Sequence, residues 1–330
     1  MITEQDIAAA AGVSQATVSR VLRSGPWVKA EVREKVLRIA REMNYLGKVR
    51  HIAVILQKET AFLSYITMMQ QAIFDEFERR NYHAQIIMEG GEQLLSTANF
   101  AGAFSLMSRS GFERRWAEEQ LLPLVCLNTD PNRMNNIASV SGNDAQGVRL
   151  ALDYLTARGH RRIGFLLSRI GIRSVRPEVS SGNIDDLLSR RSGSRTVRTR
   201  LQAFRQYFRR DCPGGTPYLI ESDRIGEIIE FVRRERLSAL IVNGESNSLA
   251  VPALLGAGGV RIPGELSVIT YEDTTTSRYA VPPLTTIRQN IPEIVRRALD
   301  ILEIQIRGEP APGDLLVDYE LIERASVRAL

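Results

Sequence analysis

The feature that most constrains how this chain can fold is a single glycine between two short helical patterns. Thr3 has the position of a helix N-cap and Asp6 that of its partner in the first turn, and the run Ile-Ala-Ala-Ala-Ala over 7–11 continues the helix. Gly12 then offers the left-handed conformation that ends a helix. The pattern predicts a first helix that stops abruptly at Gly12.

A second short helix is predicted over 15–22, with Ser14 as its N-cap. Val18, Val21 and Leu22 lie three and four residues apart, so they form one buried stripe. The small residue Ala8 lets the two helices cross closely, and Val18 fills the angle between them. This spacing is that of a helix-turn-helix.

A third helix is predicted from about residue 30 to 43, although Lys29 is a weak start. Its apolar residues recur at helical spacing, and Tyr45 covers the open side of the core. The stripe consists of Val28, Val32, Val36, Ile39 and Met43. We therefore expect an all-α unit over 1–46, followed by a short linker over 47–50.

The net charge of +5 is concentrated in this unit. Residues 1–50 carry nine Lys and Arg against five Asp and Glu, whereas the other 280 carry 34 against 33. A basic helix-turn-helix indicates binding to DNA phosphates. The alternative is a three-helix bundle that binds protein.

The second helix of such a unit enters the major groove, and its outward residues meet base edges. Arg20 has the geometry to bond guanine in a fork, Gln15 to pair with adenine, and Ala16 to touch the thymine methyl group. These three are the predicted base-reading residues. The hydroxyl residues Ser14, Thr17 and Ser19, with the linker residues Lys48 and Arg50, are predicted to contact the DNA backbone.

From His51 onward, short apolar strands alternate with longer helical segments. A first series includes 52–56, 84–88, 102–106 and 122–127, and a second includes 162–167, 238–242 and 266–270. Apolar strands separated by helices indicate parallel sheets covered on both faces. Two doubly wound subdomains are therefore expected, with a ligand cleft at the carboxyl ends of their strands.

The N-terminal motif resembles the headpiece of the LacI/GalR family of bacterial transcription regulators. The resemblance rests on GVSQATVSRVL over 12–22, VKAEVREKV over 28–36 and Asn44-Tyr45. It continues through GHRRI over 159–163, VRIPGELSV over 260–268, PPLTTIRQ over 282–289 and IERAS over 322–326. Nearly the whole chain is covered.

The resemblance implies a core like that of type I periplasmic binding proteins. Its N-subdomain is expected at 51–160 plus 290–318 and its C-subdomain at 161–289 plus 319–330, with crossovers near 158–163, 288–291 and 318–320. Carried over by position, the effector-binding residues would be Asn128, Arg200, Asn243 and Glu272. Together they would hydrogen-bond the hydroxyl groups of a sugar or sugar derivative.

Two departures limit what the resemblance implies. Relatives place a hinge helix between headpiece and core that kinks the DNA, but here only Leu46-Gly-Lys-Val-Arg50 intervenes. The segment 168–200 is longer than in relatives and carries eight arginines against three acids. It is either a lid for an anionic ligand or a surface loop.

The sequence lacks the residues and motifs that other classes of protein function require. There are three histidines (51, 83 and 160) and no HExxH, GxSxG or Walker motif, so we expect no enzyme, cofactor or metal site. His160 is interpreted as a helix cap. Cys126 and Cys212 stand in unrelated contexts, without a disulfide framework. A transport-type binding protein is disfavoured because no signal peptide or membrane span is visible, which predicts a cytoplasmic protein.

We therefore predict a homodimeric regulator, most simply a repressor, that reads a pseudo-palindromic operator in double-stranded DNA with half-sites about one helical turn apart. A small polar metabolite in the core would control it. The shortened linker leaves a second possibility open, which is a DNA-binding regulator that has lost its response to an effector.

Overall fold

The computed structural model describes residues 2–22, 28–43, 45, 51–57, 63–91, 100–106, 116, 122–128, 137–167, 195–222, 224–309 and 312–330. Its contacts divide the chain into two compact units. The first comprises Met1–Thr60, Met68–Ser141 and Ile291–Val317, and the second Ala61–Thr67, Gly142–Asn290 and Asp318–Leu330. Each unit is described by itself.

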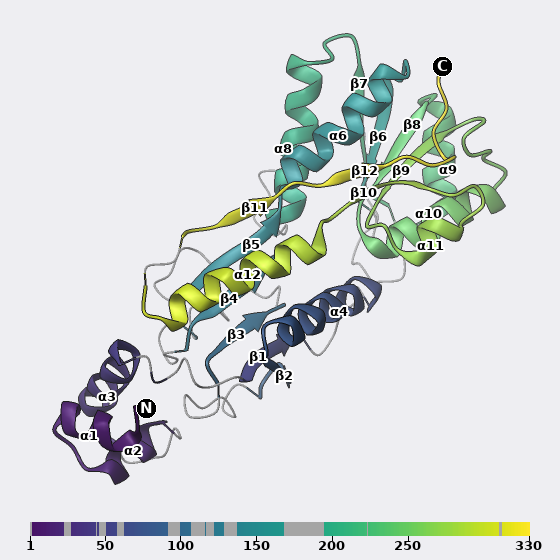
Figure 1. Cartoon of the computed structure of the whole chain (residues 1–330). Helices are drawn as coiled ribbons and strands as arrows, with labels where there is room; N and C mark the ends of the chain where they lie inside the picture. Colours follow the sequence, from purple (N-terminus) through teal and green to yellow (C-terminus); the bar gives the residue numbers. More distant parts are fainter. Residues whose placement is uncertain are drawn as a thin grey trace. The chain divides into compact units, whose positions relative to one another are not determined.

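The chain begins with three helices, α1 (Glu4–Ala11), α2 (Gln15–Leu22) and α3 (Ala30–Glu42), as predicted (Figure 1). The Thr3 hydroxyl accepts a hydrogen bond from the Asp6 amide, and the Asp6 carboxylate accepts one from the Thr3 amide. Gly12 ends α1 with φ 65°, in the left-handed region that a glycine adopts without strain. The predicted cap and the predicted stop are both confirmed.

The three helices enclose one small apolar core. Its buried members are Ile7, Ala8, Ala11, Val18, Val21, Leu22, Val36, Leu37, Ile39 and Ala40. Tyr45 packs against this core from the side and is only partly buried, as predicted. Leu37 and Ala40 widen the buried face of α3 beyond the stripe read from the sequence, because a helix packed on two others buries more than one narrow row.

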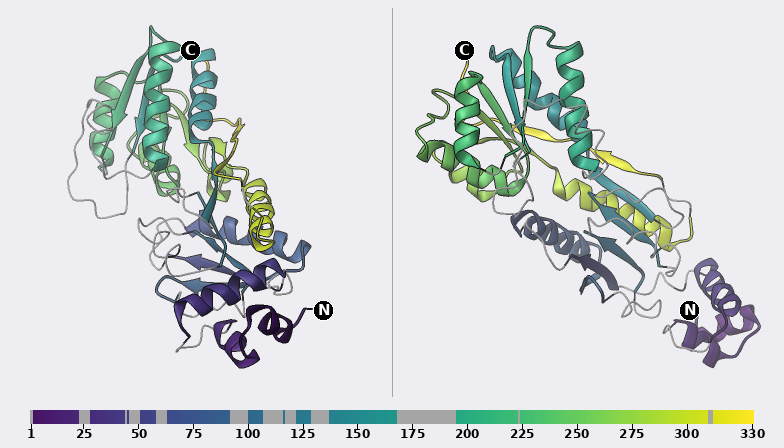
Figure 2. Two further views of the ribbon diagram at one scale, coloured as in Figure 1. Left: turned by 90° about the vertical axis from the view of Figure 1, so that its left-hand side faces the viewer. Right: turned by 180° about the vertical axis from the view of Figure 1, so that it is seen from behind.

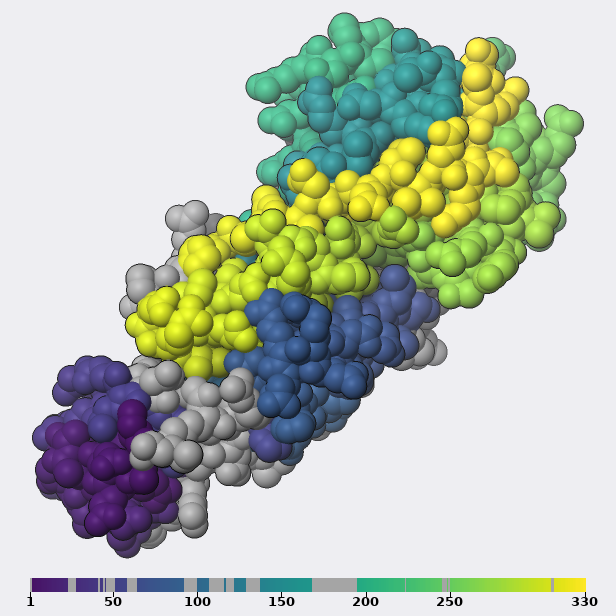
Figure 3. Space-filling model, viewed as in Figure 1, coloured from purple at the N-terminus to yellow at the C-terminus, as the bar shows by residue number. Residues whose placement is uncertain are grey.

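The first sheet has the order β11-β5-β4-β3-β1-β2 over the described residues. Its strands are β1 (His51–Leu56), β2 (His83–Met88), β3 (Gly102–Ser105), β4 (Leu124–Leu127), β5 (Ile137–Gly142) and β11 (Leu315–Val317). Strand β1 pairs in parallel with both β2 and β3, so the chain winds outward in both directions from this point. Helix α12 (Ile291–Ile306) packs on β3 and β4, and α4 (Leu63–Arg79) lies next to it, which gives one continuous surface (Figures 1 and 3).

The second sheet repeats this winding in the order β12-β10-β9-β8-β6-β7. Its strands are β6 (Arg162–Leu166), β7 (Thr216–Ile220), β8 (Ala239–Val242), β9 (Ser267–Tyr271), β10 (Thr285–Arg288) and β12 (Glu320–Ile322). The strands pair in parallel except for β12, which is antiparallel to β10. The prediction of two doubly wound sheets is confirmed.

Helices cover both faces of the second sheet. Phe165 on β6 packs in one apolar cluster with α6 (Asp144–Ala157) and α8 (Arg195–Arg210), while the next residue, Leu166, packs in another with α9 (Ile225–Arg234) and α10 (Glu245–Ala257). Successive side chains of a strand point to opposite faces, so the two clusters lie on either side of the sheet. The two views in Figure 2 show α6 and α8 side by side. The short helix α11 (Thr275–Tyr279) follows β9.

In the division by contacts, α6 belongs to the same unit as the second sheet. The subdomain boundary predicted near residue 160 would instead place α6 with the first sheet. The division near 160 stays a prediction. No helix in the described part of the chain is long and apolar enough to cross a membrane.

Candidate functional site

Helix α2 has one buried side and one exposed side. Val18, Val21 and Leu22 are completely buried against α1 and α3. The predicted base-reading residues Gln15, Ala16 and Arg20 are all exposed. A helix anchored in this way presents its polar face without any change in the fold.

The hydroxyl residues of α2 are partly engaged within the protein. The Ser14 hydroxyl accepts a hydrogen bond from the Thr17 amide at 3.1 Å, and the two hydroxyl oxygens lie 2.9 Å apart. Ser14 is therefore the N-cap of α2, as predicted, while Ser19 is half-buried. Lys48 and Arg50 lie outside the described residues, as does most of the arginine-rich segment 168–200.

A second polar constellation surrounds Arg200, whose side chain projects from α8 and is only 4% exposed. Its Nε donates to the Asp144 carboxylate at 2.7 Å, its Nη1 to the Asn243 side-chain oxygen at 2.7 Å, and its Nη2 to the Tyr319 hydroxyl at 3.0 Å. All four residues belong to the second unit. A buried guanidinium is stable only when it is both charge-paired and hydrogen-bonded, and here it is both.

Aromatic rings complete the surroundings of Arg200. Its guanidinium carbon lies 3.9 Å from the centre of the Tyr271 ring, a distance that gives a cation–π contact. Burial alone would lower the pKa of Arg200, but the interactions with Tyr319 and Asp144 outweigh it and hold this pKa well above its usual value. Burial also raises the pKa of Tyr271 and of Tyr319, so both phenols stay protonated at neutral pH.

Two of the predicted effector residues have unusual backbones. Glu272 follows β9 with φ 65° and Asn128 follows β4 with φ 56°, in the left-handed region that residues other than glycine rarely adopt. The Glu272 carboxylate accepts a hydrogen bond from the buried Gln289 side chain at 3.0 Å. Backbone strain of this kind gathers at binding sites, and it costs on the order of 1–3 kcal/mol per residue.

The structure places three of the four predicted effector residues in the second unit. Arg200 and Asn243 bond each other directly, and Glu272 adds to the electrostatic stabilisation of Arg200. Asn128 belongs to the first unit. The sequence interpretation missed the partners of Arg200 and Glu272, which are Asp144, Tyr271, Gln289 and Tyr319.

His160 has a different role from the one expected. Its ring is fully buried, with Nδ1 3.0 Å from the Ser238 hydroxyl and Nε2 2.9 Å from the backbone carbonyl oxygen of Arg328. The interpretation as a helix cap is therefore wrong for the side chain, which instead fastens the C-terminal segment to the second sheet. Within the described ranges, no group of three or more His, Cys, Asp or Glu residues is arranged to hold a metal ion.

Comparison with known proteins identifies both parts of the chain. Residues 3–47 match the family described as bacterial regulatory proteins, lacI family, and residues 152–327 match the periplasmic binding protein-like domain. The probable HTH-type transcriptional repressor ExuR of Bacillus subtilis (strain 168) is 26% identical over 363 residues, which cover 100% of this chain and 99% of the relative. The lactose operon repressor of Escherichia coli (strain K12) is 25% identical, covering 99% of this chain and 91% of the relative.

Solved structures share the fold over almost the entire length. The lac repressor dimer bound to operator and the anti-inducer ONPF superposes with a TM-score of 0.65 at 22% identity and covers 99% of both chains. The transcriptional regulator CelR in complex with cellobiose superposes with a TM-score of 0.64 at 21% identity, covering 99% of this chain and 100% of that one. The chain therefore belongs to the lacI family of bacterial regulatory proteins, whose members are DNA-binding transcriptional regulators and not enzymes.

Proposed function

We propose that this protein is a repressor that binds operator DNA as a homodimer through α2 and is controlled by a small polar metabolite. The observation that carries the DNA-binding part is the division of α2 into a fully buried apolar side and an exposed side with Gln15, Ala16 and Arg20. Such a helix fits the major groove, and each good bidentate contact to a base contributes about 1–3 kcal/mol of discrimination.

The test begins with selection of bound sequences from a random library of DNA duplexes by the purified full-length protein. We expect enrichment of a pseudo-palindrome whose half-sites lie about one helical turn apart. Arg20→Ala should relax the preference at one base pair in each half-site, because a base contact is lost. Uniform weakening on all sequences would assign Arg20 to a phosphate instead, and no enrichment by the wild type would refute the proposal.

Arg38→Ala is a matched control within the same three-helix unit. Arg38 is an exposed arginine on α3 and pairs with Glu42 four residues later, at 3.0 Å. Because it does not lie on α2, its loss should leave the selected sequence unchanged. A change in sequence preference equal to that of Arg20→Ala would show that the two substitutions act through charge alone.

Exposed apolar side chains on each unit support the homodimer. Phe74 on α4 and Ile86 and Met88 on β2 are exposed, and β2 stands at an edge of the first sheet. In the second unit, Tyr279 and Val281 are the most exposed apolar side chains near α11. Exposed apolar side chains on an edge strand of the described sheet favour association with a second chain. Sedimentation analysis should give twice the chain mass, and a monomer that binds operator at the same concentration would refute this part.

Arg200, Asn243 and Glu272 support a hydroxylated effector such as a sugar. The first two bear hydrogen-bonding groups at the carboxyl-end side of the second sheet, and one structural neighbour, the regulator CelR, forms a complex with cellobiose. Thermal melting of the full chain with sugars, sugar phosphates and nucleosides should show a rise for one class, because a ligand of the folded state stabilises it. Intact operator binding with no rise for any class would favour a regulator without an effector.

A further inference from the structure

The guanidinium of Arg200 is already bonded on every nitrogen by its own unit. Asp144, Asn243 and Tyr319 each take one of its three nitrogens, at 2.7, 2.7 and 3.0 Å. One of these partners, Tyr319, lies on the segment between β11 and β12, far along the sequence from the others. Of the three partners, the Tyr319 hydroxyl is the group that a bound hydroxyl compound would also supply.

The hydroxyl of Tyr319 acts both as acceptor and as donor. It accepts from Nη2 of Arg200 and donates to the Asp144 carboxylate oxygen, with 3.0 Å in each case. Because Asp144 also accepts from Arg200 Nε, the three groups close a ring of hydrogen bonds. A sugar hydroxyl between a guanidinium and a carboxylate would make the same two bonds.

The backbone around Tyr319 is fixed from α6. The Gln146 side chain accepts from the Tyr319 amide at 2.8 Å and donates to the Tyr319 carbonyl oxygen at 3.2 Å. The side chain of Asn143, the N-cap of α6, donates to the neighbouring Asp318 at 2.7 Å. The chain therefore holds the ring at this place through bonds in which Arg200 takes no part.

Two glycines make room for the ring. A Cβ atom at Gly142 would lie 2.5 Å from the Tyr319 hydroxyl oxygen, and one at Gly147 would lie 3.0 Å from the ring. The first distance is shorter than a Cβ atom tolerates, so any larger residue at Gly142 would force the phenol away, whereas at Gly147 the ring would have to shift by a few tenths of an ångström. Tyr271 packs edge-on against the same ring, with centroids 6.1 Å apart. The site is thus shaped around a phenol group.

We propose that Tyr319 is an internal ligand of Arg200 and sets the specificity of this site. Its phenol occupies the position between Nη2 of Arg200 and Asp144 that a hydroxylated ligand would take, so a ligand that binds at this position must replace the phenol hydroxyl with one of its own. The proposal rests on the proposed role of Arg200 in effector binding. It restricts the effector class to compounds with a hydroxyl that both donates and accepts at this position.

The experiment replaces the internal ligand with a free one. Tyr319→Ala opens a phenol-shaped space, and 4-methylphenol should raise the melting temperature of this variant by at least about 2 °C at saturation. Toluene, which has the same ring without the hydroxyl, should give a smaller rise at equal concentration. The wild-type chain should show neither rise, because its own ring fills the space.

A second pair of variants keeps the proposal testable if Tyr319→Ala does not fold. Tyr319→Phe removes a hydroxyl with two partners, and Tyr271→Phe removes one that has no hydrogen-bond partner among the described residues, from a ring in the same cluster. We expect Tyr319→Phe to lower the melting temperature clearly and Tyr271→Phe to leave it unchanged or raise it. Equal effects of the two substitutions would overturn the proposal.

The outcomes separate this proposal from the proposed function. A folded Tyr319→Ala protein that does not respond to 4-methylphenol, or that responds equally to toluene, overturns the internal ligand even if wild-type operator binding is intact. A specific response to 4-methylphenol supports it. If metabolites then shift the melting temperature of neither the wild type nor Tyr319→Ala, the role of Arg200 in effector binding fails while the internal ligand stands.

Discussion

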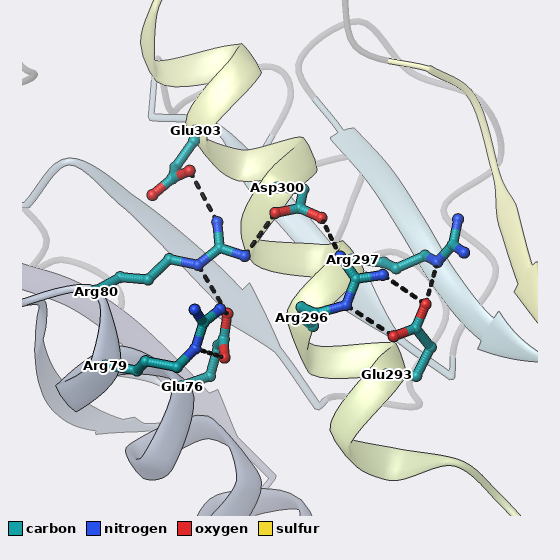
Figure 4. Close-up of polar contacts among 8 residues, drawn as sticks. All are labelled: Glu76, Arg79, Arg80, Glu293, Arg296, Arg297, Asp300 and Glu303. Atoms are coloured by element: carbon teal, nitrogen blue, oxygen red, sulfur yellow. Dashed lines mark hydrogen bonds and ion pairs between the residues drawn. The ribbon is translucent and has the colours of Figure 1, made fainter.

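Two arginines, Arg80 in the first unit and Arg200 in the second, show how the same side chain serves different purposes. Arg80 follows α4 and contacts three carboxylates, Glu76 of α4 at 2.7 Å and, on α12, Asp300 at 2.6 Å and Glu303 at 2.9 Å (Figure 4). Arg200 has one carboxylate and two neutral partners. The side chain of Arg80 is 17% exposed, and that of Arg200 is 4% exposed.

The difference in partners follows from the difference in solvent. Around Arg80, three carboxylates gather without a large electrostatic cost because neighbouring arginines balance their charge and the surface is partly open to water. Two of them also bond to other arginines of the same surface, Glu76 to Arg79 and Asp300 to Arg296 (Figure 4). Around Arg200, burial permits only balanced charge and directed hydrogen bonds. We therefore expect the first arrangement to tolerate the loss of a partner better than the second.

Arg200→Leu should produce the largest effect. It leaves the Asp144 carboxylate without its cation and removes a partner from Asn243 and Tyr319 in a buried place. Removing one member of a buried ion pair costs about 3–5 kcal/mol of the free energy of unfolding. Urea unfolding followed by circular dichroism measures this loss.

Arg198→Leu is the matched control for this prediction, because Arg198 lies on the same helix and is exposed. Its loss should change the free energy of unfolding by less than about 0.5 kcal/mol, as for most surface substitutions. If both variants were equally stable, Arg200 would be no more critical than a surface arginine, and the contrast with Arg80 would disappear.

The elements that could be predicted from sequence are those specified by neighbouring residues. The first helix is determined by Thr3, Asp6 and Gly12, which all lie within ten positions, and the capping bonds and left-handed turn form as expected. Parallel strands such as 52–56 could be recognised in the sequence because a strand covered on both faces is apolar throughout. Local patterns of this kind need no knowledge of distant contacts.

The partners of Arg200 could not be found in this way because they come from distant parts of the chain. Tyr319 is 119 positions from Arg200, and Asp144 is 56 positions from it. The family resemblance indicated Arg200 and Asn243 as effector-binding residues. It did not indicate Tyr319, because a tyrosine between two short strands fits a surface position as well as a core one. The remaining signal was Gly142 at the end of a strand, since a glycine there often marks a close approach of another group.

Arg80→Leu should have a smaller effect that depends on salt. The loss of contact with Glu76, Asp300 and Glu303 should lower the free energy of unfolding by roughly 1–2 kcal/mol at low ionic strength, since this is a network and not an isolated surface pair. In 1 M NaCl the Debye length falls to about 3 Å, so the difference from the wild type should shrink. Paired urea titrations at low and high salt measure it.

Arg79→Leu serves as the comparison for Arg80→Leu. Arg79 pairs with Glu76 at 2.5 Å, but its side chain is 60% exposed and reaches no residue of α12 in the described contacts. Its loss should cost less than that of Arg80 at every salt concentration. A salt-independent loss at Arg80, similar to the loss at Arg200, would mean that exposure does not decide which of these arrangements tolerates substitution.

The last prediction extends the contrast to a buried histidine. Burial lowers the pKa of His160 below 6.5, aided by the charges of Arg328 and Arg158, while hydrogen bonding to the Arg328 carbonyl opposes this in part. The folded state therefore favours the neutral ring, and its stability is complete above pH 6.5, where the ring is neutral in the unfolded chain too. As the pH falls below 6.5, the unfolded chain binds a proton first, so the free energy of unfolding should decrease by at most about 1.4 kcal/mol per pH unit.

His160→Gln should lower stability at pH 7.5 but flatten its decline between about pH 6.5 and 5.0, since the titrating group is gone. His83→Gln is the control, because His83 is exposed at the start of β2 and contacts the ring of His51. Urea unfolding at a series of pH values distinguishes the two. If His83→Gln flattened the curve as much as His160→Gln, the decline would belong to the surface pair, and burial in the second unit would not be what couples this protein's stability to pH.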